Sequence, residues 1–169
     1  MVKEAEWLMP HITIEYVITL PILILQIILF PLTASWLMNV WVDSRRTLAL
    51  EEAASHIGST IQQVYFTLNH NTVHELSFVQ RPEVPKFIED IPYAGNGTLK
   101  ALDPSPNSAK VLELTFRLAG TKIVVKTSVL LGQSAEWNET STFISNSTDA
   151  CVRAWKFPNG TIRLQFGGG

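Results

Sequence analysis

The chain has 169 residues, a formal net charge of −2 and a sequence pI of about 6.1, and 46% of its residues are hydrophobic. This length leaves room for one small domain once the apolar N-terminal third is set aside. The scattered basic residues give no electrostatic basis for nucleic-acid binding. The single cysteine, Cys151, excludes an internal disulfide and does not support a thiolate metal site.

After a short N-terminal tail or leader over residues 1–10, an uncharged run extends from Tyr16 to Val42. As a helix its 27 residues would be about 40 Å long, enough to cross a hydrocarbon core of about 30 Å. The run is too long for the apolar region of a cleavable secretory signal. It is also too long for a buried helix in so small a domain. The sequence therefore predicts a membrane span or a helix that packs against other helices.

Pro21 and Pro31 lie inside this run. In water, each proline would cost about 3 kcal/mol in a helix interior. Membrane helices and close-packed bundles tolerate proline better, with kinks. We therefore expect one bent helix.

The pattern becomes amphipathic after Asp43, with apolar residues at helical spacing. These residues are Leu50, Ala54, Ile57, Ile61, Val64, Tyr65 and Leu68. The sequence thus predicts a helix over 11–69, of which the part from Ile12 to Leu68 would be about 85 Å long. A compact domain of about 100 residues has a radius of gyration near 13 Å. Most of the helix should then need lipid or other helices to cover it.

Residues 70–169 show strand patterns and predict a small antiparallel β domain of about five or six strands. Hairpins are expected where Ala119-Gly120 separates 111–118 from 122–131, and where Pro158-Asn159-Gly160 separates 151–157 from 161–166. The sheet should pack over the amphipathic half of the helix and bury Ile57, Ile61, Val64 and Tyr65. The predicted fold class is α+β, a long N-terminal hydrophobic α-helix followed by a small antiparallel β-sheet domain.

Four of the eight asparagines begin Asn-X-Ser/Thr sequons, all after the predicted helix. They are Asn96, Asn138, Asn146 and Asn159. About one asparagine in eight would match by chance, so the pattern predicts a surface-exposed, glycosylated domain outside the cell. The alternative is ordinary turn chemistry, especially at Asn159. Arg45 and Arg46 follow the apolar run, and the positive-inside rule would place the C-terminal domain in the cytoplasm. A translocated folded domain can override that charge bias.

No nucleophile elbow, P-loop, dinucleotide fingerprint or paired-carboxylate cleft is present in the sequence. His70 and His74, Glu51-Glu52 and Glu89-Asp90 are interpreted as surface residues. We therefore expect no enzymatic activity and no cofactor or metal, apart from covalent N-linked glycans.

The segment His11-Ile12-Thr13-Ile14-Glu15-Tyr16 resembles the start of a mature archaeal type IV pilin, with glutamate at the fifth position before a long apolar helix. The run from Glu15 to Pro21 is also similar to the opening of tight-adherence pseudopilins. The resemblance covers roughly residues 11–68, together with a sheet domain that carries sequons. Met9-Pro10 departs from the basic and small residues that the family's peptidase expects before the cleavage point.

The resemblance implies a homopolymeric, extracellular filament for adhesion or surface attachment, whose subunits wait in the membrane before assembly. It implies cleavage before His11 by a prepilin peptidase, assembly machinery as a partner, and roles for Glu15, Pro21 and Pro31 in filament assembly. Glu15 would meet the N-terminal amine of a neighbouring subunit; the alternative is that Glu15 simply marks the edge of the membrane. The alternative is a minor pseudopilin or a single-span, membrane-anchored surface protein that does not polymerise.

Overall fold

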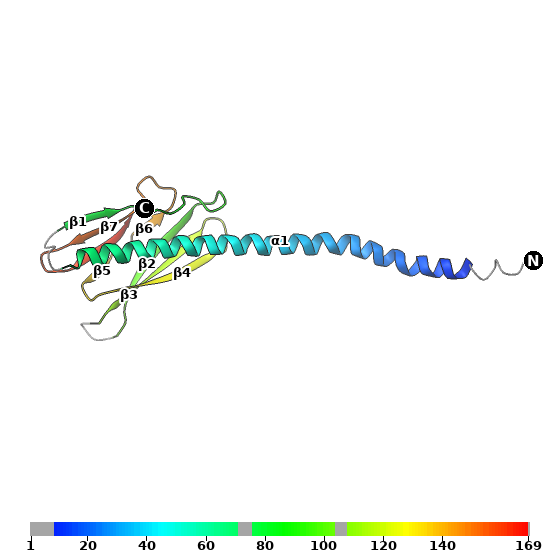
Figure 1. The fold of residues 1–169 in the computed structure, drawn as a ribbon, viewed down its shortest axis with the longest axis horizontal. Helices are drawn as coiled ribbons and strands as arrows, with labels where there is room; N and C mark the ends of the chain where they lie inside the picture. Colours follow the sequence, from blue (N-terminus) through cyan, green and yellow to red (C-terminus); the bar gives the residue numbers. More distant parts are fainter. Residues whose placement is uncertain (1–8, 71–75, 104–107, 169) are drawn as a thin grey trace, which may run out of the picture. The chain divides into compact units, whose positions relative to one another are not determined.

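The computed structural model describes the backbone of residues 9–70, 76–103 and 108–168, and the side chains of the same ranges from Tyr16 onward. Within these ranges one helix precedes eight strands (Figure 1). They are α1 (Met9–Leu68), β1 (Leu76–Gln80), β2 (Tyr93–Ala101), β3 (Lys110–Leu118), β4 (Val124–Leu131), β5 (Ala135–Trp137), β6 (Thr142–Ile144), β7 (Cys151–Lys156) and β8 (Ile162–Gly167). The predicted α+β layout, a long N-terminal helix before a small, mainly antiparallel sheet domain, is confirmed.

Helix α1 is one continuous element of 60 residues that includes both Pro21 and Pro31. The prediction of a single helix is therefore confirmed. The helix ends at Leu68, where the amide of Asn69 still donates to the carbonyl of Tyr65 at 2.8 Å. The chain divides into two compact units, Met1–Asp43 and Ser44–Gly169, and α1 contributes to both.

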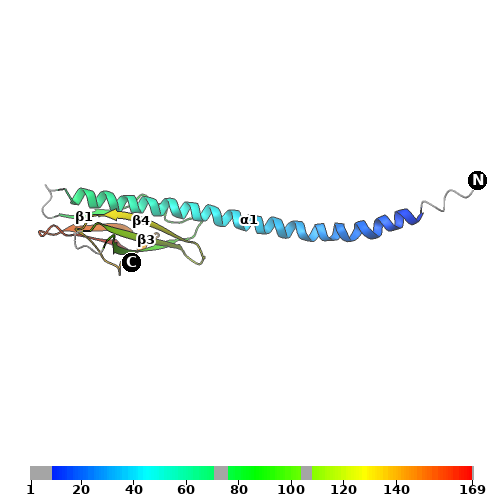
Figure 2. The same cartoon turned by 90° about the horizontal axis from the view of Figure 1, so that it is seen from below.

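In the second unit, the end of α1 forms one side of the hydrophobic core. Leu50, Ile57, Ile61 and Leu68 are fully buried, and Val64 and Tyr65 are at most 3% exposed, as the spacing predicts. Figure 2 shows this part of α1 lying along the sheets. Gly58 permits the close approach, because a Cβ there would lie 3.1 Å from Cγ2 of Val129.

The strands form two sheets, with the orders β1-β7-β8-β5 and β4-β3-β2-β6. The expectation of one sheet of five or six strands is therefore wrong. Both predicted hairpins are present, with Thr127 opposite Leu114 in β3–β4 and Leu164 opposite Ala154 in β7–β8. Their turns place Gly120 and Gly160 at φ of 68° and 84°, where glycine is favoured. Short β5 pairs with β8 in parallel, an exception to the antiparallel pattern.

Strand β2 was not among the predicted strands, because its centre reads Gly95-Asn96-Gly97. Both glycines face the core, where aromatic rings occupy the space that a side chain would need. A Cβ at Gly95 would clash with the ring of Phe116, and one at Gly97 would lie 2.7 Å from Cε2 of Trp137. The two rings fill the space beside the glycines, and their packing stabilises a strand that has few residues with high β-propensity.

The aromatic rings of the core form one connected cluster drawn from both sheets. Phe166 contacts Trp137 edge to face at a centroid distance of 4.9 Å, and Phe143 at 5.5 Å. Phe116 and Tyr93 extend the cluster at 6.2 to 6.4 Å. Such pairs add about 0.5–1.5 kcal/mol each beyond burial, so the cluster joins the two sheets.

The connections between elements follow the expected chemistry where the structure describes them. Residues 81–85 form no strand, as their two prolines predict. Glu89 and Asp90 are exposed in a tight turn between Ile88 and Ile91, and Glu89 Oε2 accepts from Arg46 Nε at 2.7 Å. Helix α1 ends one residue before the predicted end at residue 69, and the predicted surface role of His74 lies outside the described residues.

Tyr93 makes the stability of this domain sensitive to high pH. Burial raises the pKa of Tyr93 from 10.0 to about 12, because the phenolate would lose its solvation. The unfolded chain releases this proton first, so the stabilisation is complete below pH 10 and is lost as the pH rises towards 12. We expect the free energy of unfolding to fall over this interval and to fall less in Tyr93→Phe, which keeps the ring.

Denaturant titrations at a series of pH values would measure how steeply the free energy of unfolding falls with pH in the unmodified chain and in Tyr93→Phe. The variant should also lose about 1 kcal/mol at neutral pH, because the Tyr93 hydroxyl donates to the carbonyl of Pro85 at 2.8 Å. Identical slopes in the two proteins would contradict the assignment.

Candidate functional site

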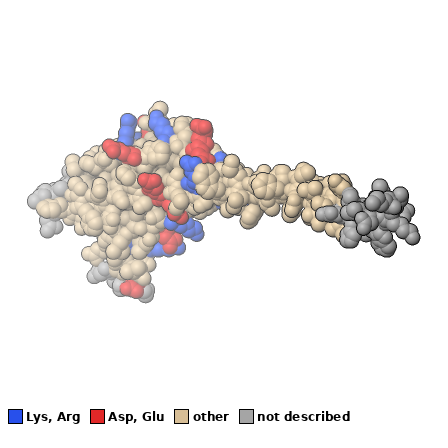
Figure 3. Space-filling view, turned by 45° about the vertical axis from the view of Figure 1, so that its right-hand side comes forward, with Lys and Arg blue, Asp and Glu red and all other residues tan. Residues whose placement is uncertain are grey.

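The first candidate site is the uncharged part of α1, residues 16–42, which we call the apolar segment. Its large apolar side chains from Tyr16 to Trp41 are between 48% and 75% exposed, in contrast to the buried row from Leu50 to Leu68. Figure 3 shows neither acidic nor basic side chains along this part of the chain. A helix that is apolar all round is stable only inside lipid or a protein bundle.

The helix is long and apolar enough to cross a membrane, and none of its apolar window is buried within the chain. Pro31 has no amide hydrogen and therefore cannot donate to the carbonyl of Ile27. Close by, the hydroxyl of Thr33 donates to the carbonyls of Leu29 and Phe30 at 3.1 and 2.9 Å. The backbone around the proline thus has a local polar partner, which matters in a medium without water.

The predicted assembly residues are distributed along this helix. Pro21 and Pro31 lie within the apolar segment. His11 and Glu15 lie in the first turns of α1, and their side chains are outside the described residues. Cleavage before His11 and the pairing of Glu15 with a neighbouring amine therefore remain predictions.

The four sequons form the second set of candidate residues, and two of them lie in turns. Asn146 is exposed in the turn that follows β6. Asn159 is exposed between β7 and β8, and its Oδ1 accepts from the amide of Thr161 at 3.0 Å. That bond is the turn chemistry that the alternative interpretation gives for Asn159.

Asn96 lies in a strand, whereas Asn138 begins a turn in which its Oδ1 accepts from the amide of Thr140 at 3.3 Å. Asn96 is exposed in the middle of β2, opposite Thr115 of β3 and Thr142 of β6, so turn chemistry does not explain it. Asn138 follows β5 and is half-buried, and its Nδ2 donates to Oε1 of Gln165 at 3.2 Å. An N-glycan would replace one of the two Nδ2 hydrogens and leave one to donate, so a glycan at Asn138 would compete with that bond for space and orientation.

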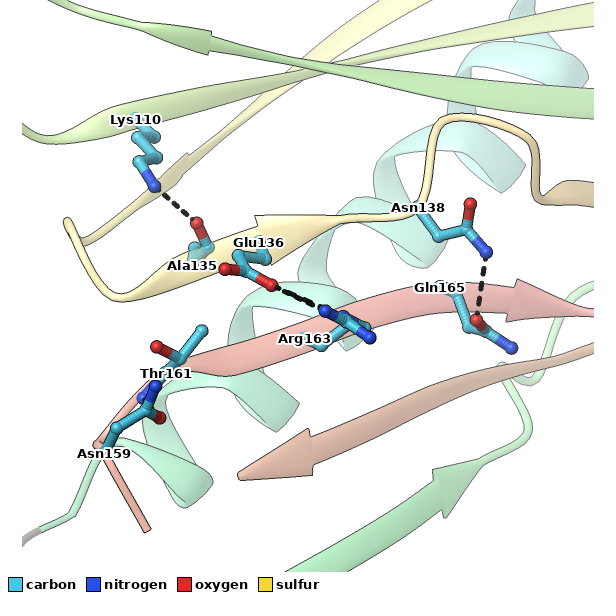
Figure 4. A network of polar contacts seen from close by, with 8 residues as sticks. All are labelled: Lys110, Ala135, Glu136, Asn138, Asn159, Thr161, Arg163 and Gln165. Carbon is cyan, nitrogen blue, oxygen red and sulfur yellow. Dashed lines mark hydrogen bonds and ion pairs between the residues drawn. The ribbon is translucent and has the colours of Figure 1, made fainter. Parts of the chain in front are cut away.

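Charged and polar side chains around β5 and β8 border a surface hollow of about 560 Å³ (Figure 4). Arg163 Nη2 binds Glu136 Oε2 at 3.1 Å, and its guanidinium lies 5.3 Å from the ring centre of Phe157. Lys110 Nζ donates to the carbonyl of Ala135 at 2.7 Å. Arg163 and Glu136 thus pair with each other and Lys110 pairs with a backbone carbonyl, while Glu139 also lines the hollow.

Among the described side chains, no three His, Cys, Asp or Glu residues are grouped so that they could hold a metal ion. Cys151 is buried in β7, beside Gly167 of β8. The sequence predictions also omit a residue that the structure makes conspicuous. Gln26 lines an apolar hollow in the apolar segment, and its signal in the sequence is a spacing of seven residues from both Thr19 and Thr33.

Comparisons with known proteins identify no relatives of this chain. No protein-family model, no curated protein and no solved structure matches it. A functional proposal therefore rests on the physical properties of the apolar segment and of the domain that follows it.

Proposed function

We propose that this chain is a structural subunit of an extracellular, type IV pilus-like filament that polymerises through its N-terminal helix. The observation that carries the proposal is the uniform exposure of the apolar segment, on a helix whose later half is the core of a folded domain. Leaving a large apolar side chain in water costs about 1.5–3 kcal/mol relative to burying it. The segment must therefore be covered by lipid before assembly and by the helices of other copies afterwards.

The two halves of α1 suit the two roles of such a subunit. The later half fixes the helix to its own domain through Leu50, Ile57, Ile61 and Leu68, all of them fully buried. The earlier half carries no charge from Tyr16 to Val42, so it can pass between a bilayer and a protein bundle without stripping water from an ion. The assembly machinery and a prepilin peptidase are the further partners that the proposal requires, and the role is structural rather than enzymatic.

The test is to shear the surface of cells that produce the chain and to examine the released material by electron microscopy with antibodies against residues 44–169. Labelled fibres, and a native N-terminus at His11, are the expected results. Recovery of the chain only from detergent-solubilised membranes would overturn polymerisation and leave the alternative, a single-span surface protein or minor pseudopilin.

We further propose that the domain carries N-linked glycans, with Asn96 and Asn146 as the foremost positions. Both side chains are exposed, and their third residues, Thr98 and Thr148, are exposed as well. Peptide mass spectrometry of the sheared material should find hexose-containing adducts at Asn96, and Asn96→Gln should remove them. Unmodified peptides at all four sequons would overturn this part of the proposal.

A further inference from the structure

Three polar residues of the apolar segment lie on one side of the helix. Thr19, Gln26 and Thr33 are seven residues apart, and each step of seven returns to within about 20° of the same direction. We call these three residues the polar strip. Ser35 and Asn39, the other small polar residues of the segment, lie about 200° and about 240° around the helix from Thr33, on roughly the opposite side.

Two residues of the polar strip, Gln26 and Thr33, line a hollow in the helix surface. The hollow measures about 550 Å³, and its lining residues are Leu23, Gln26, Ile27, Leu29, Phe30, Pro31 and Thr33. Two sets of four among them, 23-26-27-30 and 26-29-30-33, have the spacing of the holes that receive side chains in helix–helix packing. Gln26 and Phe30 belong to both holes, so the side chains of a second helix would enter beside the Gln26 carboxamide.

Gln26 brings a chemical requirement to this position. Its carboxamide has two donor hydrogens and an acceptor oxygen, and it forms no hydrogen bond within the part of the chain whose side chains are described. Thr33 differs, because its hydroxyl is already bonded to the carbonyls of Leu29 and Phe30. Lipid tails offer a carboxamide no partner, whereas an identical carboxamide offers both a donor and an acceptor.

We propose that the polar strip is the face through which two copies of this chain pack, with their Gln26 carboxamides hydrogen-bonded to each other. Apolar side chains of the second copy enter the two holes on either side of that bond. The occupant is a second copy because the carboxamide is complementary to itself and the segment carries no charge that would select a different partner. This inference rests on the proposed function. It adds which side of the helix contacts the second copy, a point that the proposed function does not specify.

Disulfide trapping in the full-length chain, reconstituted in lipid vesicles, tests the assignment. Single cysteines are introduced at the strip as Thr19→Cys and Thr33→Cys, which leave Gln26 in place, and on the other side as Ser35→Cys and Asn39→Cys. The buried Cys151 stays in place, and the unmodified chain gives the background. Because a disulfide needs Cα atoms within about 7 Å, we expect several-fold more cross-linked dimer from the strip cysteines than from the other two.

A second measurement tests whether the Gln26 hydrogen bond itself strengthens the association, which cross-linking alone does not show. Gln26→Leu should weaken self-association in vesicles about tenfold by energy transfer between labelled chains, while the matched variant Asn39→Leu should leave it unchanged. Equal cross-linking on both sides, or no effect of Gln26→Leu, would overturn the strip and leave the proposed function standing. If no cysteine variant forms a cross-linked dimer, no energy transfer is seen between labelled chains and no fibres are found, the proposed function is overturned as well.

Discussion

A chain shortened to residues 44–169 should be a folded, soluble monomer, whereas the full-length chain should need detergent or a membrane. The shortened chain keeps the compact unit from Ser44 to Gly169, including the buried row from Leu50 to Leu68. It lacks the apolar segment, whose large side chains are 48% to 75% exposed. Exposed apolar surface of that extent drives association in water, so its removal should change the behaviour of the whole molecule.

Light scattering after size-exclusion chromatography, with and without detergent, measures the difference. Circular dichroism of the shortened chain should show helix from the retained part of α1 and a cooperative thermal transition. A full-length chain that stays monomeric in water would contradict the expectation, because it would mean that the segment finds cover within its own chain.

The second large effect is expected from Ile57→Asp in the shortened chain. Ile57 is fully buried in the core formed by α1 and the sheets. The variant removes an apolar side chain and places a carboxylate where it loses its hydration. We expect a loss of more than about 4 kcal/mol, enough to unfold a domain whose total stability is about 5–15 kcal/mol.

Ser55→Asp is the matched control, because Ser55 is exposed on the same turn of α1. It introduces the same carboxylate and should change the free energy of unfolding by no more than about 0.5 kcal/mol. Urea titrations followed by tryptophan fluorescence measure both variants. Similar stabilities for the two would mean that the contact between α1 and the sheets contributes little to folding.

Local patterns carry enough information to predict α1 and the two hairpins. The spacing of Leu50, Ile57 and Ile61 identifies the buried face of the helix, since only the residues of one side recur at that interval. The sequences Ala119-Gly120 and Asn159-Gly160 mark the hairpin turns because glycine accepts a positive φ. These signals depend on neighbours in the chain, so one sequence suffices to detect them.

Strand β2 and the division into two sheets depend on distant residues instead. Gly95 and Gly97 lower strand propensity, and the rings that compensate come from Phe116 and Trp137, more than twenty positions away. Strands β5 and β6 have three residues each, too few to show an alternating pattern. The site shows the same division. The four sequons can be recognised directly, whereas the importance of Gln26 depends on the hollow that it lines.

The unbroken course of α1 from the apolar segment into the domain has a mechanical consequence. Tension applied to the N-terminal part would reach the Arg46–Glu89 contact and then act along the buried row from Leu50 to Leu68. Pulling along this row strains many side-chain contacts together instead of separating them one after another. Resistance to force then depends on the rate at which the core unfolds, so the packing of α1 against the two sheets sets the pull that the domain withstands.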